Sequence, residues 1–239
     1  MNHYDLSGRA ALVTGGASGL GAAAAAALVA AGARVAVFDR QAAALGGPAV
    51  AGDISDFAQV TAAVDRINEQ LGPVDILVNS AGIAGPWLSA LTLDEPEWTR
   101  IMTVNATGTF NICRAVVPGM VDRGYGRVVL VSSVAGKEGN PLLPAYAASK
   151  AAVIAFGKSI ARDVAGTGVL VNLITPAVFE TPMAIDQPAE IVDRMVSSVP
   201  LGRMGKPSEA AALICWLCSE DCSFSTGAVF DISGGRSVY

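Results

Sequence analysis

Tyr146 and Lys150 stand four positions apart in the segment AYAASKAAVIAFGKSI, which spans residues 145–160. In a helix this spacing places both side chains on one face, a single turn apart. A phenol beside an ammonium group can exchange a proton with a substrate. A chance pair on a solvent-exposed helix face would have no chemical role. The other elements of the chain decide between these two interpretations.

Other side chains suited to acid–base or metal chemistry are scarce. The only histidine is His3, so neither a Ser-His-Asp triad nor a histidine-based zinc site can form, and we expect no metal. Cys215 and Cys218 have the spacing of a redox motif. They lie, however, in the helical pattern PSEAAALICWLCSED among apolar residues, which favours buried, reduced thiols. Acid–base work must therefore use another side chain.

Composition narrows the class of protein. Apolar residues make up 52% of the chain and charged residues 15%, which is typical of a folded globular protein. The net charge is −5 with no basic cluster, so we expect no nucleic-acid partner. The first residues lack the pattern of a secretory signal, and glycine, proline or charge interrupts each long apolar run. We therefore expect no membrane span and a cytoplasmic location.

Short β-branched runs alternate with longer alanine-rich helical patterns. The expected strands lie within 10–16, 34–39, 48–55, 74–82, 126–133, 168–176 and 228–235, and the expected helices within 20–32, 56–72, 94–123, 145–165 and 207–220. Continuous apolar strands separated by helices are typical of a parallel sheet covered on both faces. We expect an α/β fold with a doubly wound, Rossmann-type parallel sheet of about seven strands, forming a single domain over residues 1–239.

In such folds, ligands bind beyond the carboxyl ends of the strands. The glycine-rich turn TGGASGLG, residues 14–21, follows the first strand and opens a helix. Its glycines would let the backbone approach a ligand, and the helix would direct free N–H groups and its positive dipole at a phosphate. The turn therefore predicts a dinucleotide pyrophosphate site formed by Gly15, Ser18, Gly19, Leu20 and Gly21.

Asp39 follows the second strand, about 18 residues after the glycine turn, as an acid that binds the adenosine ribose would. Its carboxylate would accept hydrogen bonds from both ribose hydroxyls and repel a 2′-phosphate. A helix cap or a solvated loop acid is the alternative. Arg40 could accommodate that phosphate, but the glycine turn contains no Lys or Arg, so we expect NAD rather than NADP.

Two further strand ends carry candidate cofactor residues. Asp53 and Ile54 follow the third strand, where the adenine would lie, with a helix cap as the alternative role for the acid. The fourth strand ends in the small-residue turn NSAG, which could lie against the nicotinamide ribose through Asn79, Ala81 and Gly82.

The ordered combination of four motifs resembles the short-chain dehydrogenase/reductase family, in its short, single-domain branch. These motifs are TGGASGLG, NSAG, the serine pair that ends thirteen residues before the tyrosine of YAASK, and Asn105 in VNATGTF. The resemblance covers essentially the whole chain. It implies that Tyr146 is the catalytic acid–base, and that Lys150 binds the nicotinamide ribose and lowers the pKa of Tyr146. It also implies that Ser133 binds the substrate oxygen and that Asn105 supports a water in a proton relay.

The same resemblance places Phe179 and Thr181 at the nicotinamide end of the cofactor. The chain departs from the family pattern at two places. It has Pro176-Ala177 where the family usually has Pro-Gly, and the stretch between Asp39 and Asp53 is short. The second departure would leave the adenine edge more open.

Three functions are compatible with these motifs. The first is an NAD(H)-dependent oxidoreductase that acts on a secondary alcohol or ketone, such as a sugar or polyol. The alternative is an NADPH-dependent ketone or 3-oxoacyl reductase, which Arg40 favours. A non-catalytic dinucleotide sensor is a remote third possibility, since it predicts a broken Ser-Tyr-Lys set. The expected substrate walls lie in 83–98, 134–144 and 178–203, the last within a substrate-loop region around 178–206. They offer Trp87, Lys137, Glu138, Asn140, Leu142, Leu143, Phe179, Glu180 and Met183.

The helices expected at 102–123 and 145–165 carry small apolar residues beyond the stripes that would face the sheet. In the second helix these are Ala151, Ala152, Val153, Ile154, Ala155, Phe156 and Ala161. Contiguous apolar patches of this kind usually form interfaces. The last strand lies at the edge of the sheet, so its free edge must also be covered or paired. The helix patch and this edge predict two self-complementary surfaces and therefore a homotetramer, with a dimer as the alternative.

Overall fold

The computed structural model describes residues 4–41, 47–237 and 239; His3 and the segment 42–46 lie outside them. One sheet contains the parallel strands β1 (Ala10–Thr14), β2 (Arg34–Asp39), β3 (Ala49–Ala51), β4 (Ile76–Asn79), β5 (Gly126–Val131), β6 (Val169–Pro176) and β7 (Val229–Ile232). Their order in the sheet is β3-β2-β1-β4-β5-β6-β7. The order reverses between β1 and β4, which confirms the predicted doubly wound, Rossmann-type fold.

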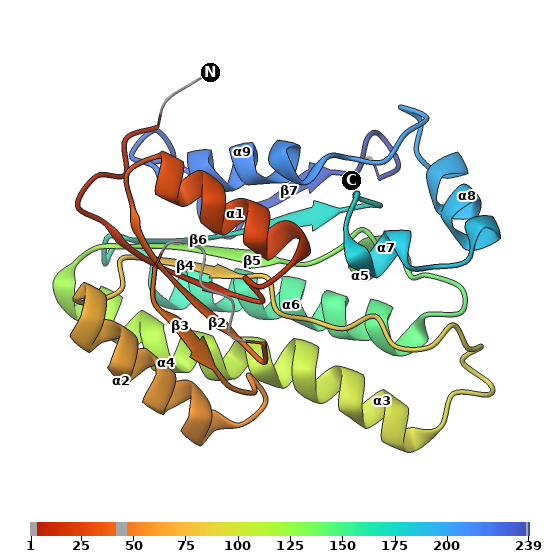
Figure 1. The fold of residues 1–239 in the computed structure, drawn as a ribbon, viewed down its shortest axis with the longest axis horizontal. Helices are drawn as coiled ribbons and strands as arrows, with labels where there is room; N and C mark the ends of the chain where they lie inside the picture. The colour runs from red at the N-terminus through yellow and green to blue at the C-terminus, as the bar shows by residue number, and fades with distance from the viewer. Residues whose placement is uncertain (1–3, 42–46, 238) are drawn as a thin grey trace.

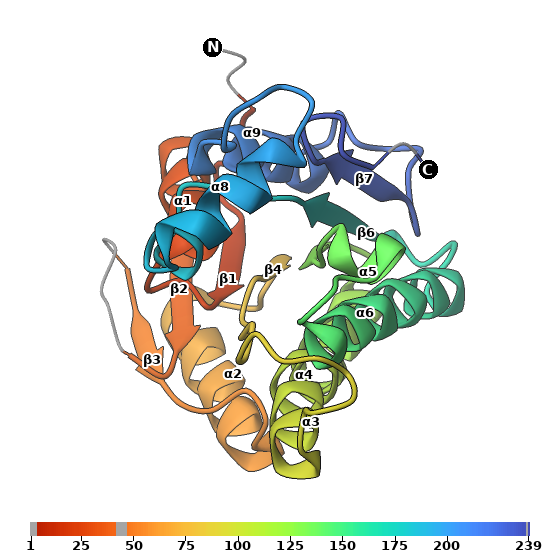
Figure 2. The same cartoon turned by 90° about the vertical axis from the view of Figure 1, so that its right-hand side faces the viewer.

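Helices cover both faces of the sheet (Figures 1 and 2). One face is covered by α2 (Phe57–Leu71), α4 (Gly108–Arg123) and α6 (Pro144–Asp163), and the other by α1 (Gly19–Ala30) and α9 (Pro207–Cys218). The central strands therefore pack against a core on each side. In β1, Leu12 faces one core and its neighbour Val13 faces the other. This alternation explains why the strands are continuous apolar runs in the sequence.

The helical stretch expected at 94–123 consists of three consecutive segments. α3 (Glu95–Met102) leads into the π-helical turn η1 (Thr103–Thr107), and α4 follows directly. Asp94 caps the start of α3 by accepting a hydrogen bond from the Glu97 N–H. Gly124 ends α4 in the left-handed conformation, with φ of 70°. Asn105 lies in the π-helical turn and is buried there; such turns often occur at functional sites.

Three short helices have no clear signal in the sequence: α5 (Ala135–Glu138), α7 (Pro182–Ile185) and α8 (Ala189–Ser197). The second and third form from the stretch that the sequence analysis describes as a loop region. All three lie beyond the carboxyl ends of the strands, which face the viewer in Figure 2. No described helix has the length and apolar content that a membrane span requires.

The cysteines confirm the expected buried thiols. All four are free and buried. Burial raises the pKa of Cys113 to about 12 and that of Cys215 to about 11. Since the thiolate is the reactive form, these residues serve packing.

Candidate active site

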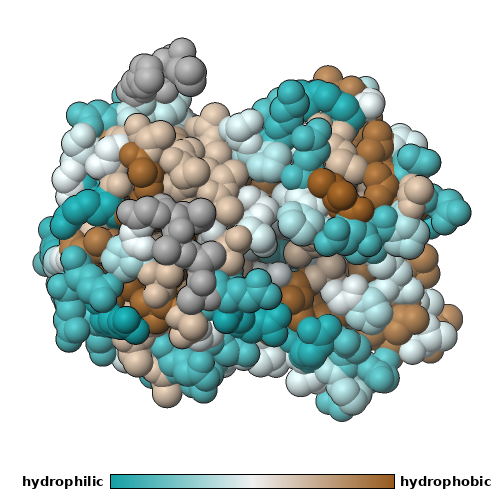
Figure 3. All heavy atoms as spheres, viewed as in Figure 1, coloured by the Kyte–Doolittle hydropathy of each residue, from teal (hydrophilic) through white to brown (hydrophobic). Residues whose placement is uncertain are grey.

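A cleft of about 610 Å³ opens at the carboxyl ends of the strands. Its walls come from the turns that follow β1 to β6, from α6 and from the segment that contains α7 and α8. In the space-filling view, a hollow near the middle of the face has apolar atoms at its rim (Figure 3). The cleft therefore occupies the position where doubly wound folds bind their ligands.

Most of the residues predicted to bind the cofactor or to act in catalysis line this cleft. They are Gly15, Ser18, Gly19, Leu20, Asp39, Asp53, Ile54, Ala81, Gly82, Ser133, Tyr146, Lys150, Phe179 and Thr181. Gly21, Asn79 and Asn105 are not among the lining residues. Their contacts, described below, show that they support the walls from behind.

The glycine turn brings its backbone unusually close to the rest of the protein. Gly15 has φ of +64°, and a Cβ there would lie 2.7 Å from the Cα of Ala81. A Cβ on Gly21 would lie 2.2 Å from the carbonyl oxygen of Gly15, which explains why this glycine supports the turn without lining the cleft. Because α1 begins at Gly19, its free N–H groups and dipole face the cleft. The turn thus fits an anionic group such as a pyrophosphate.

Asp39 is held at the end of β2 by two backbone groups. Its Oδ2 accepts a hydrogen bond from the Ala17 N–H and its Oδ1 accepts one from the Gln41 N–H, each at 3.0 Å. Each oxygen retains a lone pair for a further donor. The carboxylate therefore ties the glycine turn to β2 and can still accept ribose hydroxyls. Arg40 beside it also lines the cleft.

Asp53 lines the cleft, but its carboxylate also serves a local turn. Oδ1 accepts hydrogen bonds from the Ser55 hydroxyl at 2.6 Å and from the Ser55 N–H at 2.8 Å, which hold the pKa of Asp53 below its ordinary value. Asp53 is not the helix cap that was its alternative role. Asp56 caps α2, accepting hydrogen bonds from the N–H groups of Ala58 and Gln59.

Asn79 joins β1 and β4 to α4 from behind the cleft. Its amide nitrogen donates to the Thr109 hydroxyl at 2.8 Å, and its oxygen accepts from the Thr14 hydroxyl. The Thr14 oxygen in turn accepts the Ala81 N–H at 3.2 Å. The side chain therefore fixes the turn that lines the cleft and is not itself placed to contact a ligand.

Tyr146 and Lys150 lie one turn apart on α6, as predicted, and Ser133 follows β5 on the facing wall. The Lys150 ammonium donates to the carbonyl oxygen of Val131 at 3.0 Å and lies 5.7 Å from the centre of the Tyr146 ring. Ser133 Oγ accepts the Ala135 N–H at 3.1 Å, which fixes the hydroxyl at the start of α5. The three side chains thus converge on one part of the cleft.

Burial dominates the acid–base properties of this cluster. It raises the pKa of Tyr146, and a hydrogen bond with Ser133 lowers it by a smaller amount. Burial also lowers the pKa of Lys150 from 10.5 to about 8. Without a bound cofactor, the pKa of Tyr146 is therefore raised overall. The family resemblance had implied that Lys150 lowers this pKa. A phenolate here requires additional positive charge near the ring.

Three hydrogen bonds inside the protein hold the side chain of Asn105. Its amide nitrogen donates to the Ile83 carbonyl and to the Ser149 hydroxyl, and its oxygen accepts the Ile83 N–H, all at 2.9 Å. Ser149 Oγ donates to the carbonyl oxygen of Tyr146 at 2.8 Å. A Cβ on Gly82 would lie 3.2 Å from Asn105 Oδ1 and 3.3 Å from Lys150 Nζ, so glycine at this position lets both polar groups approach the turn without crowding.

The far end of the cleft only partly matches the substrate walls expected from the sequence. Of the expected residues, Trp87, Asn140, Leu143, Phe179 and Met183 line the cleft, while Lys137, Glu138, Leu142 and Glu180 do not. Ile83, Gln187 and Met195 line the cleft within the expected wall ranges, whereas Ala17, Phe38, Gln41 and Arg236 line it without having been predicted. Ala17 lies inside the glycine turn and Gln41 is close to Asp39, so both could have been inferred. Arg236 lies in a tail without periodic pattern.

The fold and the cleft together define a dinucleotide-binding oxidoreductase, and comparison with known proteins agrees. A family model described as enoyl-(acyl carrier protein) reductase matches residues 15–237. The 2-dehydro-3-deoxy-L-rhamnonate dehydrogenase (NAD(+)) of Sphingomonas sp. (strain SKA58) is 46% identical over 97% of this chain and 96% of that protein. A 3-oxoacyl-[acyl-carrier-protein] reductase of Thermotoga maritima is 38% identical over 98% of this chain and 99% of its own.

A solved structure described as the crystal structure of gox2181 superimposes with a TM-score of 0.94, at 32% sequence identity, over 98% of both chains. The chain belongs to the short-chain dehydrogenase/reductase family. The resemblance inferred from TGGASGLG, NSAG and YAASK is thereby confirmed.

Proposed function

We propose that this protein is an NAD(H)-dependent oxidoreductase that interconverts a secondary alcohol and a ketone on a small hydroxylated compound, such as a sugar or polyol. The observation that carries the proposal is the convergence of Ser133, Tyr146 and Lys150 on a cleft that also contains the glycine turn and Asp39. The relative named as an NAD(+) dehydrogenase supports the same choice of reaction.

In the proposed oxidation, a bound nicotinamide supplies the acceptor for the hydride that leaves the substrate carbon. Tyr146 Oη takes the hydroxyl proton, and Ser133 Oγ donates a hydrogen bond to the same substrate oxygen. Lys150 has a pKa of about 8, so at neutral pH it is mostly protonated. Its charge, together with that of the oxidised nicotinamide, would offset the burial that raises the pKa of Tyr146. Reduction uses the same groups in reverse.

For Asn105 we propose a positioning role. Both of its amide protons are used on Ile83 and Ser149, and its oxygen keeps one lone pair for the water of the expected relay. Through Ser149 the side chain also holds the backbone carbonyl of Tyr146. The asparagine would therefore fix the distance between the turn after β4 and the first turn of α6.

NAD is the proposed cofactor because Asp39 presents a carboxylate where a 2′-phosphate would lie. A specific observation favours the alternative, an NADPH-dependent ketone or 3-oxoacyl reductase. Arg40 lines the same end of the cleft. The relative from Thermotoga maritima is likewise named as a 3-oxoacyl reductase. The residues at 178–206, which contain α7 and α8, are proposed to form the substrate loop.

The deciding experiment is a panel of sugars, polyols, simple secondary alcohols and 3-hydroxyacyl thioesters, each incubated with NAD or NADP and followed by absorbance of the reduced cofactor. The proposal expects turnover of a polyol or other small alcohol with NAD. Turnover confined to thioesters with NADP would instead establish the alternative.

We also propose a homotetramer. Val153 and Ala161 are buried in the core of the subunit, so they cannot contribute to the expected interface. Ala151 and Ala155 are exposed, and on the same side of the sheet Phe110 of α4, 45% exposed, meets Phe156 of α6 edge to face at 6.1 Å. This surface supports one contact between subunits. Light scattering tests the assembly, and a mass near 24.2 kDa would refute it.

A cytoplasmic location remains part of the proposal. Four free, buried cysteines are compatible with a reducing compartment. Fractionation of cells that express the chain, with detection in the soluble fraction, is the corresponding test.

A further inference from the structure

The substrate end of the cleft contains one charged group that the proposed reaction does not use. Among the described residues that line the cleft, the charged ones are Asp39, Arg40, Asp53, Lys150 and Arg236. The first three lie at the adenosine end and Lys150 belongs to the catalytic cluster. Arg236, in the tail after β7, is thus the single described charge at the far end.

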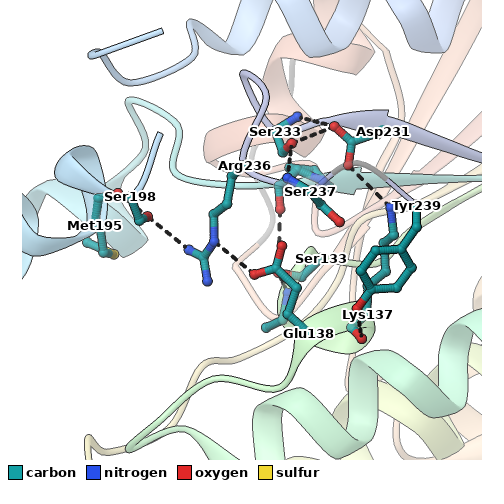
Figure 4. Close-up of polar contacts among 12 residues, drawn as sticks. Ser133, Lys137, Glu138, Met195, Ser198, Asp231, Ser233, Arg236, Ser237 and Tyr239 are labelled. Carbon is teal, nitrogen blue, oxygen red and sulfur yellow. Dashed lines mark hydrogen bonds and ion pairs between the residues drawn. The ribbon is translucent and has the colours of Figure 1, made fainter. Parts of the chain in front are cut away.

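Arg236 bridges the two walls of that end (Figure 4). Its Nε donates to Glu138 Oε2 at 3.1 Å, at the end of α5, and its Nη1 donates to Ser198 Oγ at 3.3 Å, at the end of α8. The side chains of Arg236 and Glu138 are 19% and 24% exposed, so the pair is largely shielded from solvent. Glu138 itself does not line the cleft.

The tail that carries Arg236 is fixed on both sides of it. The Ser237 N–H donates to Ser233 Oγ at 3.0 Å, and the Tyr239 hydroxyl donates to the Lys137 carbonyl at 2.8 Å. Lys137 forms an ion pair with Asp231 at 3.5 Å. The arginine is therefore held in place by the fold.

The two contacts use only part of the guanidinium. Of its five N–H groups, one on Nε and one on Nη1 are engaged, and Nη2 has no hydrogen-bond partner among the described residues. Figure 4 shows this nitrogen directed away from both partners. Since Glu138 binds at Nε and Ser198 takes one N–H of Nη1, both N–H groups of Nη2 and the second one of Nη1 remain for a planar anion.

From this geometry we infer that the substrate is a short hydroxy acid or keto acid whose carboxylate binds the Nη edge of Arg236, a conclusion that rests on the proposed function. Glu138, which binds Arg236, is the last residue of α5, and Ser133 lies two residues before that helix begins, so both groups belong to one short segment of the cleft wall. A short acid could place its reacting carbon at Ser133 and its carboxylate at Arg236 along this segment. A neutral polyol or a thioester would leave Nη2 without an anion, although Nε is paired with Glu138.

The test compares acids with their methyl esters, because the ester keeps the shape and removes the charge. The probes are 2- and 3-hydroxy acids of four to six carbons and the corresponding esters, assayed with NAD. Binding of the same pairs to the enzyme–NAD complex by saturation-transfer NMR requires no turnover. For wild type we expect higher kcat/KM and stronger binding for the acids. Equal behaviour of acid and ester would overturn the inference.

Arg236→Gln should lower kcat/KM for acids by about 10- to 100-fold, mainly through KM, and change the values for esters by less than about threefold. Arg194→Gln is the matched control. It removes the same charge from an exposed position on α8 outside the cleft lining. Equal losses for acid and ester in Arg236→Gln would show that the arginine only ties the walls together.

Glu138→Gln separates the two roles further. It weakens the ion pair but keeps the arginine, so acid binding should persist or strengthen. If the ion pair were purely structural, this variant would share the defect of Arg236→Gln for every substrate. Arg236→Lys, which keeps the charge, should retain more binding of acids than of esters and covers the case in which the glutamine variant fails to fold.

Failure of the proposed function has a different signature. In that case no probe yields reduced cofactor and Tyr146→Phe changes nothing, while the NMR comparison of acids and esters still reports on Arg236. Loss of acid preference with intact NAD-dependent turnover of esters or polyols would instead overturn the carboxylate site alone.

Discussion

The two ends of the cleft are built in different ways. Along the part expected to bind the cofactor, backbone packs against backbone: Gly15 lies against Ala81, and Gly21 lies against Gly15, at distances that exclude any side chain. At the substrate end, short helices and a tail contribute long side chains, and Met183 is 48% exposed. The first arrangement leaves little freedom for change, whereas the second can vary by substitution of single side chains.

This difference indicates how one fold can keep its cofactor while changing its substrate. Residues of the adenosine end are fixed by strand-to-helix turns that the sheet itself requires. Residues of the substrate end belong to segments that contribute few side chains to the two hydrophobic cores on either side of the sheet. Perturbations at the catalytic centre, at the adenosine end and at the substrate end should therefore produce separable effects.

The largest effect is expected where the two ends meet, at the phenol. Tyr146→Phe removes the proton-transfer group and should lower kcat by about 10²- to 10⁴-fold. The NAD dissociation constant, measured by fluorescence, should change only a few-fold. Tyr125→Phe is the control, because that half-buried tyrosine packs against the Arg9 and Arg127 guanidinium groups away from the cleft. A Tyr146→Phe enzyme with near wild-type turnover would refute the assignment.

The second effect concerns the buried ammonium. The pKa of Lys150 is about 8 in the folded protein and 10.5 ordinarily, so on raising the pH the folded state loses its proton first. Stability should therefore rise between pH 8 and 10.5, by up to about 3 kcal/mol relative to a variant without the group. Urea unfolding of wild type and Lys150→Met across this range measures the difference.

Lys158→Met, at an exposed position on the same helix, provides the control for that comparison. The difference between wild type and this variant should stay flat over the same pH range. A flat difference for Lys150→Met as well would mean that Lys150 keeps its ordinary pKa.

The third effect isolates the adenosine end. Asp39→Asn keeps the shape and the acceptor for the Ala17 N–H but removes the charge. The ratio of kcat/KM for NAD to that for NADP should fall by about tenfold or more, because the repulsion of a 2′-phosphate is lost. Asp39→Ala should in addition weaken both cofactors. A wild-type enzyme that binds NADP more tightly than NAD in calorimetry would contradict this account.

The same contrast explains what the sequence could predict. β1, the glycine turn and α1 follow from local patterns, since apolar runs, glycines and helix starts have direct physical causes within a few residues. The spacing of Tyr146 and Lys150 is likewise a local property of one helix. The fold class and the meeting of the glycine turn, Tyr146 and Lys150 in one cleft could therefore be predicted from the sequence, while the chemical roles of these residues stay predictions.

Other features depend on contacts between distant segments, and patterns do not reveal them. Asn79 and Asn105 have the residue types of ligand contacts, yet in the structure Asn79 connects β4 to α4, and Asn105 connects η1 to α6 and to the turn after β4. Arg236 reaches the cleft only because the tail after β7 packs against α5. The upward shift in the pKa of Tyr146 depends on how deeply tertiary packing buries the ring.

The smallest effect sharpens the comparison at the substrate end. Asn140 and Glu180 are both polar residues that the sequence places in the substrate walls, but only Asn140 lines the cleft. Asn140→Ala removes one possible hydrogen bond to the substrate, which is worth a few-fold to about tenfold in KM. The KM for NAD should not change, because the residue lies away from the adenosine end.

Glu180→Ala, in contrast, should leave the substrate KM within about twofold, since the exposed carboxylate does not line the cleft. Steady-state kinetics on one substrate from the panel measures the substrate KM of both variants and the KM for NAD of Asn140→Ala. Equal shifts for Asn140→Ala and Glu180→Ala would mean that the substrate contacts a wider surface than this cleft. A change in the KM for NAD upon Asn140→Ala would show that the two ends are coupled, because a residue of the substrate end would then govern cofactor binding.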